Sequence, residues 1–158
     1  MKQDRFLTGI LIGIGVLVVI ALTVFFTRKD TQSYGAEDVP EGVVHNYVVA
    51  ILNKDYEKAY GYLADLPHKP TMNSFRQSFL NGGVNPNNAA VDIGASDITG
   101  DEASVEVVLI YSPGDPFSSG YRDAQRAVLV KQNGAWKISW MPTYYFWDYS
   151  WYSEPPKP

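Results

Sequence analysis

A long stretch without charge near the N-terminus constrains this chain more than any other feature. Phe6 to Phe26 is 21 residues long and holds no charged side chain. As an α-helix it would span roughly 31 Å at ~1.5 Å per residue, about the thickness of the hydrocarbon core of a bilayer. A helix also satisfies its own backbone hydrogen bonds in lipid. We therefore expect residues 1–29 to form an N-terminal transmembrane anchor.

The residues around this stretch favour an uncleaved signal anchor. A cleaved signal peptide has a shorter apolar region, about 7–15 residues, and small residues at its cleavage site. Here the bulky pair Phe25 and Phe26 ends the stretch, and the chain has no cysteine that could carry a lipid. Two basic residues lie on each side, so the N-terminal amine tips the positive-inside count towards a cytoplasmic N-terminus of a single-pass protein.

The remainder of the chain is acidic. Residues 30–158 hold 9 Lys+Arg and 16 Asp+Glu, a net charge of −7. This negative charge makes nucleic acid an unfavourable partner, because binding to phosphates requires clustered positive charge. Two histidines and no cysteine offer too few ligands for a metal site. We expect no metal and no cofactor.

Helical spacing of apolar residues predicts three helices after a polar linker over residues 30–38. The first begins near Asp38, with Glu41 completing a capping box. Asp55 caps the second, which ends at the prolines that follow, and Thr71 caps the third, which ends at Gly82.

The apolar period then changes from 3.6 to 2, which predicts about four antiparallel strands over residues 91–98, 103–111, 127–132 and 135–141. Between the last two strands, Asn133-Gly134 is a strong signal for a two-residue hairpin turn. That turn would place Leu129 opposite Ile138 and Ala127 opposite Trp140. The expected fold class is α+β: a transmembrane helix, then about three helices packed on a curved antiparallel sheet.

Three stretches resemble one known family. Asn53 to Tyr60 resembles the helix-turn-helix signature of the nuclear transport factor 2-like superfamily (NTF2-like). Gly100 to Val107 resembles its mid-sheet strand, and Val128 to Ile138 its final hairpin. The resemblance is greatest to membrane-anchored, extracytoplasmic bacterial members of unassigned function. It implies a cone-like domain over residues 39–143 with a pocket inside, placed outside the cell membrane.

The resemblance directs attention to side chains that could line the inside of the cone. The pocket candidates are Tyr60, Tyr111, Trp136, Trp140 and His45. Enzymes of the superfamily use Asp, His or Tyr inside the cone as acid and base. An isomerase-, cyclase- or dehydratase-like enzyme with His45 or Asp92 as base is therefore an alternative function. Tyrosines at such spacing are more commonly core residues, and a lone histidine is more commonly packed or solvated.

A C-terminal tail over residues 144–158 is rich in aromatic residues and proline. Three interpretations are open: the tail packs on the domain as an edge strand or over the cone, it forms a contact surface for a partner, or it touches a bilayer interface. Phe117, in the proline-rich loop Ser112–Gly120, is a second contact candidate. The partner-surface candidates are Tyr145, Trp147, Tyr149, Trp151 and Phe117.

The sequence therefore predicts a non-catalytic, membrane-tethered, extracytoplasmic binding or assembly module. Its expected partners are the membrane through Phe6 to Phe26, an envelope protein or a second copy of the chain, and a small apolar ligand. Two alternatives stay open: the enzyme described above, and a spacer or dimerisation domain.

Overall fold

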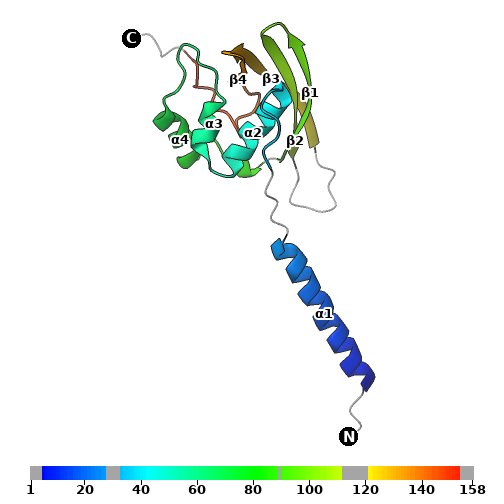
Figure 1. Cartoon of the computed structure of the whole chain (residues 1–158). Helices are drawn as coiled ribbons and strands as arrows, with labels where there is room; N and C mark the ends of the chain where they lie inside the picture. The colour runs from blue at the N-terminus through cyan, green and yellow to red at the C-terminus, as the bar shows by residue number, and fades with distance from the viewer. Residues whose placement is uncertain (1–4, 28–32, 89, 112–120, 154–158) are drawn as a thin grey trace. The chain divides into compact units, whose positions relative to one another are not determined.

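The computed structural model describes residues 5–27, 33–88, 90–111 and 121–153, and it describes the backbone alone for residues 5–7, 25–27, 88 and 111. The chain divides into two compact units, Met1–Gln32 and Ser33–Pro158. Helix α1 (Arg5–Thr27) belongs to the first unit, and the other helices and strands belong to the second, which we call the domain (Figure 1).

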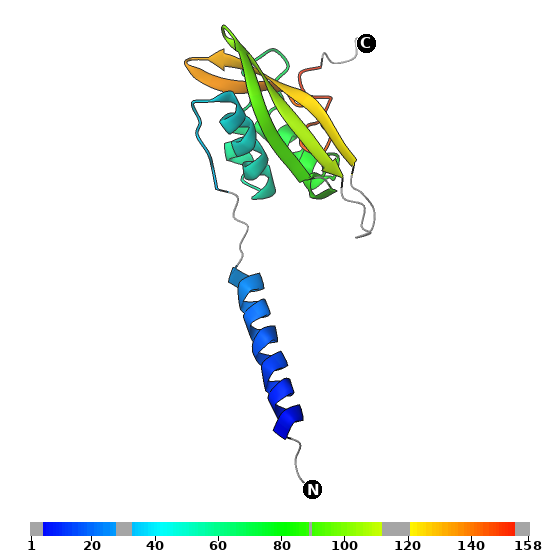
Figure 2. The ribbon, with the colours of Figure 1, turned by 90° about the vertical axis from the view of Figure 1, so that its right-hand side faces the viewer.

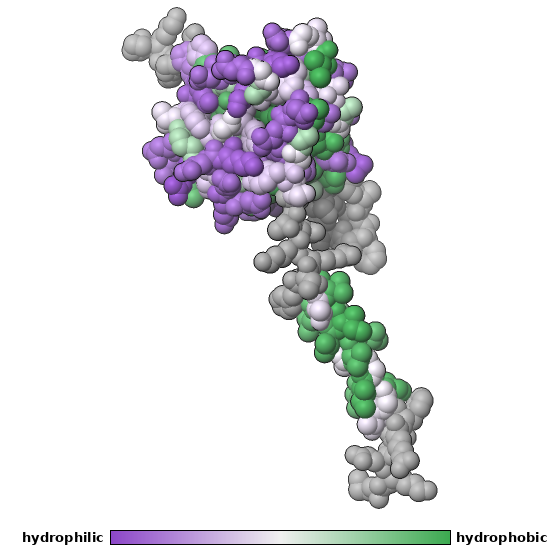
Figure 3. All heavy atoms as spheres, in the orientation of Figure 1, coloured by the Kyte–Doolittle hydropathy of each residue, from purple (hydrophilic) through white to green (hydrophobic). Residues whose placement is uncertain are grey.

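The expectation that the N-terminal helix, α1, is a transmembrane anchor is wrong. Helix α1 carries exposed apolar side chains, as Figure 3 shows. In the described part of the chain, no helix is both long and apolar enough to cross a membrane.

That finding overturns four related expectations. The span from Phe6 to Phe26, the signal anchor over residues 1–29, the single-pass topology and the cell-membrane localisation were all inferred from the same uncharged stretch. The placement of the domain outside that membrane was implied by the family resemblance and is corrected with them.

The helices of the domain begin close to the predicted positions. They are α2 (Pro40–Leu52), α3 (Tyr56–Gly61), α4 (Met72–Leu80) and the short 3-10 helix η1 (Pro86–Asn88). Asp55 caps α3 by accepting a hydrogen bond from the Lys58 N–H at 3.1 Å, and Thr71 caps α4 through the Ser74 N–H at 3.1 Å. These two caps confirm the predicted starts of α3 and α4.

The predicted capping box at the start of α2 is wrong. The N-cap residue is Val39, which has no side chain that could accept a hydrogen bond. Glu41 instead accepts a hydrogen bond from the Ser96 hydroxyl at 2.6 Å, which ties α2 to strand β1 (Ala90–Thr99). The Glu41 carboxylate therefore binds Ser96, a residue distant in the sequence, and does not complete the capping box.

The described part of the predicted linker packs along α2. Asn46 is fully buried and accepts a hydrogen bond from the Gly35 N–H at 2.6 Å, while its amide donates to the Gly35 carbonyl at 3.1 Å. Gly42 permits this approach, because a Cβ at that position would lie 2.0 Å from the Ala36 carbonyl oxygen. The domain therefore begins several residues before the first predicted helix.

The sheet has four antiparallel strands in the order β1-β2-β3-β4. They are β1 (Ala90–Thr99), β2 (Glu102–Tyr111), β3 (Tyr121–Gln132) and β4 (Ala135–Trp140). Alternate residues of β2 are buried under the helices, which lie on one face of the sheet (Figure 2): Ala103, Val105, Val107 and Leu109. The predicted alternation therefore identified the inner face of β2.

The final hairpin follows the predicted register only near its turn. Leu129 pairs with Ile138, as predicted, but Trp140 pairs with Val128 and not with Ala127. The register shifts between Val128 and Leu129, where an irregularity adds one residue to one strand. Such a shift moves a side chain to the other face, and Trp140 is accordingly 40% exposed.

The aromatic C-terminal segment, residues 143–152, folds back into the core of the domain. It forms turns and not an edge strand. Tyr145, Phe146, Trp147 and Trp151 are all less than 9% exposed. Tyr47 of α2 is fully buried and donates its hydroxyl proton to the Phe146 carbonyl at 2.7 Å. Of the three interpretations of this segment, the structure therefore shows packing against the domain.

The same segment also contacts the helices and the loop between them. The Trp151 ring lies against Phe75 of α4, with ring centroids 4.8 Å apart. The Tyr152 hydroxyl donates to the Ala64 carbonyl at 2.6 Å, and the Tyr152 N–H donates to the His68 carbonyl at 3.2 Å. The segment thus links α2, α4 and the loop after α3.

We expect Trp147→Ala to lower the free energy of unfolding by about 3–5 kcal/mol, because it leaves a large cavity in the core. Tyr149→Ala is the matched control within the same segment. Its side chain is 53% exposed, so the change should stay within about 0.5 kcal/mol. Urea unfolding of the full chain measures both. Equal, small effects would contradict the burial of this segment.

Candidate functional site

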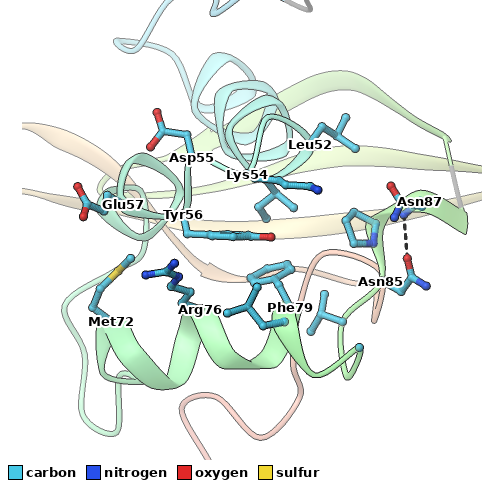
Figure 4. A pocket seen from close by; sticks show the side chains of 15 residues that line it. Leu52, Lys54, Asp55, Tyr56, Glu57, Met72, Arg76, Phe79, Asn85 and Asn87 are labelled. Atoms are coloured by element: carbon cyan, nitrogen blue, oxygen red, sulfur yellow. Dashed lines mark hydrogen bonds between the residues drawn. The ribbon is translucent and has the colours of Figure 1, made fainter.

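A pocket of about 720 Å³ opens at the edge of the helical layer (Figure 4). The C-terminal end of α2, the turn before α3, the start of α3, the length of α4 and the loop that carries η1 all contribute to its wall. The lining residues are Ile51, Leu52, Lys54, Asp55, Tyr56, Glu57, Met72, Arg76, Phe79, Leu80, Gly82, Val84, Asn85, Pro86 and Asn87.

The floor of the pocket is apolar and joins the core. Ile51 and Val84 are each 1% exposed, and Phe79 is 9% exposed. The half-buried Tyr56 ring stacks on Phe79 with centroids 5.2 Å apart and an angle of 24° between the planes. Leu80 at the rim is 55% exposed. A flat apolar group could therefore lie against an aromatic surface that the core holds in place.

The turn between α2 and α3 brings Lys54 to the pocket. Helix α2 ends in a Schellman motif, in which the Asp55 N–H donates to the Ala50 carbonyl at 2.8 Å and the Lys54 N–H to the Ile51 carbonyl at 2.9 Å. Lys54 has a φ of 60°. Glycine is the usual residue there, because a Cβ crowds the backbone in the left-handed region.

Two cations, Lys54 and Arg76, and two carboxylates, Asp55 and Glu57, line the pocket. They differ in whether another group of the domain already binds them. The Asp55 carboxylate accepts the Lys58 N–H as the cap of α3. Within the described residues, the side chains of Lys54, Arg76 and Glu57 have no hydrogen bond or ion pair. The described part of the chain contains no group of three or more His, Asp or Glu residues that could hold a metal ion.

The polar groups are divided between two ends of the pocket. In Figure 4 the Lys54 ammonium and the Tyr56 hydroxyl point towards the end where Asn85 and Asn87 lie. The two carboxylates and the Arg76 guanidinium lie towards the opposite end, on the side of Met72. No described residue hydrogen-bonds the Tyr56 hydroxyl. One end of the pocket therefore gathers hydrogen-bond donors beside the aromatic floor.

Of the five predicted pocket residues, the four whose side chains the structure describes do not line this pocket. Tyr60 donates its hydroxyl proton to the Pro70 carbonyl at 2.8 Å, and the half-buried His45 ring has its Nε2 3.1 Å from the Ser33 carbonyl. Trp136 is 6% exposed in the core and Trp140 lies at the surface. The Tyr111 side chain lies outside the described residues.

The proposed catalytic base Asp92 and the partner-surface candidates differ in how exposed their side chains are. Asp92 is exposed on β1. Tyr145, Trp147 and Trp151 are buried in the core, whereas Tyr149 is exposed. Phe117 lies outside the described residues.

Sequence reasoning passed over Lys54, Tyr56 and Arg76, the polar and aromatic residues of the pocket. It used Asn53 to Tyr60 only as a family signature for two helices and the turn between them. The available signal was a lysine at the position where a helix terminator is usually glycine or asparagine. The face of α4 that carries Arg76 could not be assigned to a pocket before the position of α3 was known.

Four described tyrosines with raised pKa values lie away from the pocket: the exposed Tyr149, and Tyr47, Tyr62 and Tyr152, whose hydroxyls form hydrogen bonds within the domain. Burial, and secondarily Tyr152, raises the pKa of Tyr47. Burial, then the hydrogen bond that it donates to Glu37 at 2.7 Å, raises the pKa of Tyr62. Burial, then Tyr60 and Asp65, raises the pKa of Tyr152. Each of these three hydroxyls donates to an acceptor within the domain, which gives it a structural role.

Comparison with known proteins assigns no family. No family model and no curated protein matches the chain. The solution structure of a SEC-C motif containing protein from Rhodopseudomonas palustris is 15% identical, with 66% of this chain and 78% of that chain covered and a TM-score of 0.46. The crystal structure of an uncharacterized cystatin fold protein from Novosphingobium aromaticivorans is 11% identical, with coverages of 66% and 97% and a TM-score of 0.42. Likeness at this level carries no argument, and membership of the NTF2-like superfamily stays a prediction.

The raised tyrosine pKa values predict a loss of stability in alkali. The unfolded chain releases these protons near pH 10, before the folded domain does, so their contribution is complete below about pH 10 and is lost as the pH rises further. We expect the free energy of unfolding to fall between about pH 8 and about pH 11, and Tyr152→Phe to reduce that fall by about 1 kcal/mol or more. Urea unfolding at the two pH values measures this. An identical fall in the variant would contradict the assignment to Tyr152.

Proposed function

We propose that the domain is a non-catalytic binding module and that the pocket between α3, α4 and η1 is its binding site. The observation that carries this proposal is the combination of an apolar, aromatic floor with free hydrogen-bond donors at one end. Ligand sites are commonly concave and mostly apolar, with a few polar groups that orient the ligand.

The size of the pocket favours a small molecule. Sites for small molecules and cofactors usually measure about 300–1,000 Å³, and about 720 Å³ falls within that range. A small ligand with an apolar part could cover Phe79 and Tyr56, and burial of that part would supply most of its binding free energy.

The lining groups favour binding over catalysis. General acid–base chemistry needs a titratable group within hydrogen-bond reach of the proton that is transferred. The Asp55 carboxylate is occupied by its cap, and Glu57 points away from the donor end. His45 and Asp92 do not line the pocket. The groups that do converge, an ammonium, a phenol and amides, suit recognition of a polar group on a ligand.

The proposal predicts where a ligand perturbs the full chain. In a fragment screen by two-dimensional NMR, we expect the amide shifts that change to cluster at residues 51–57, 72–80 and 82–87. Tyr56→Ala should weaken the best fragment about tenfold, because it removes the exposed ring of the stack. Leu80→Ala, at the exposed rim, should weaken it less and keeps the fold.

Tyr149→Ala supplies the control, since Tyr149 is an exposed tyrosine that does not line the pocket. It should leave fragment binding unchanged. Fragments that bind but shift amides elsewhere, or that bind Tyr56→Ala and the unaltered chain equally well, would overturn the proposed site.

A further inference from the structure

The left-handed conformation of Lys54 needs an explanation beyond local folding. A side chain at φ 60° carries a conformational cost that glycine would avoid. The two hydrogen bonds of the Schellman motif use only the backbone and would form equally well with glycine. The ammonium has no partner within the described residues. The side chain therefore adds nothing visible to the stability of the turn, but it does bring a positive charge to the pocket.

The pocket contains equal numbers of positive and negative side chains, but these side chains are not evenly distributed along it. The lining contains Lys54 and Arg76 against Asp55 and Glu57. Because the carboxylates point to one end and the Lys54 ammonium to the other, a ligand on the aromatic floor meets the two ends differently. The Tyr56 hydroxyl and the amides beside η1 can also donate at the lysine end. Several donors around one cation suit an anion with more than one acceptor oxygen.

We propose that the ligand is a small apolar carboxylic acid, with its carboxylate held by Lys54 and its apolar part on the Tyr56–Phe79 stack. This inference rests on the proposed function. It specifies that the ligand is negatively charged and that Lys54 selects that charge. The Tyr56 hydroxyl donates a second hydrogen bond to the carboxylate. A lysine is present at this left-handed position, in place of glycine, because its ammonium binds the anion.

The test compares acids with their neutral amides. The probes are 4-phenylbutanoate and octanoate, each paired with its amide, titrated into the full chain and followed through the amides near the pocket and the Met72 methyl group. We expect each acid to bind about 3- to 10-fold more tightly than its amide, the gain usual for a charge-assisted hydrogen bond at a partly exposed site.

Two variants of Lys54 separate its charge from its backbone. Lys54→Met keeps a long side chain and removes the charge, and it should reduce the preference for acid below about twofold. Lys54→Gly should do the same and also raise the melting temperature by about 1–4 °C, since glycine relieves the left-handed strain but gains freedom in the unfolded chain.

His68→Gly is the matched control, because His68 also has a positive φ, 63°, and does not line the pocket. It should raise the melting temperature in the same way and leave the preference for acid unchanged.

Each remaining outcome has a definite meaning. If acid and amide bind the unaltered chain equally at the pocket, the inferred anion is wrong and the binding site stands. If none of the four probes shifts the pocket residues, the inference and the proposed function both fail. If a tetrapeptide with a C-terminal Phe carboxylate binds more tightly than both acids, the small-molecule occupant is wrong and the pocket receives a chain terminus.

Discussion

Burial of the aromatic C-terminal segment is the interaction on which the rest of the domain depends. Phe146 and Trp147 are buried in the hydrophobic core, and the Tyr47 hydroxyl fixes the segment through the Phe146 carbonyl. Each fully buried ring stabilises the fold by roughly 2–3 kcal/mol, a large part of a net stability of about 5–15 kcal/mol.

Local signals predicted the elements that local interactions form. Asp55 and Thr71 cap their helices because a capping hydrogen bond joins residues three positions apart. The alternation along β2 predicted its buried face, and Asn133-Gly134 predicted the turn of the last hairpin. Each of these features is set by a few neighbouring residues and is therefore visible in the sequence.

The misses involve contacts between distant parts of the chain. Glu41 contacts Ser96, so the predicted capping box does not form. The irregularity beside Val128 shifts Trp140, and no local residue signals it. Three interpretations of the segment after Thr143 stayed open, because only the folded domain provides the space that receives it. The pocket likewise needs α3, α4 and η1 together, whereas its Lys54 could have been noticed from the Schellman position alone.

Amide hydrogen exchange of the full chain tests the central claim, that the C-terminal segment is part of the core, most directly. The Tyr152 N–H donates to the His68 carbonyl and the Ile138 N–H donates to the Tyr62 carbonyl. If the segment is core, the Tyr152 amide should be protected to a similar degree as the Ile138 amide, because both open only when the domain unfolds. Exchange of the Tyr152 amide at the rate of a free peptide, with Ile138 still protected, would contradict the account.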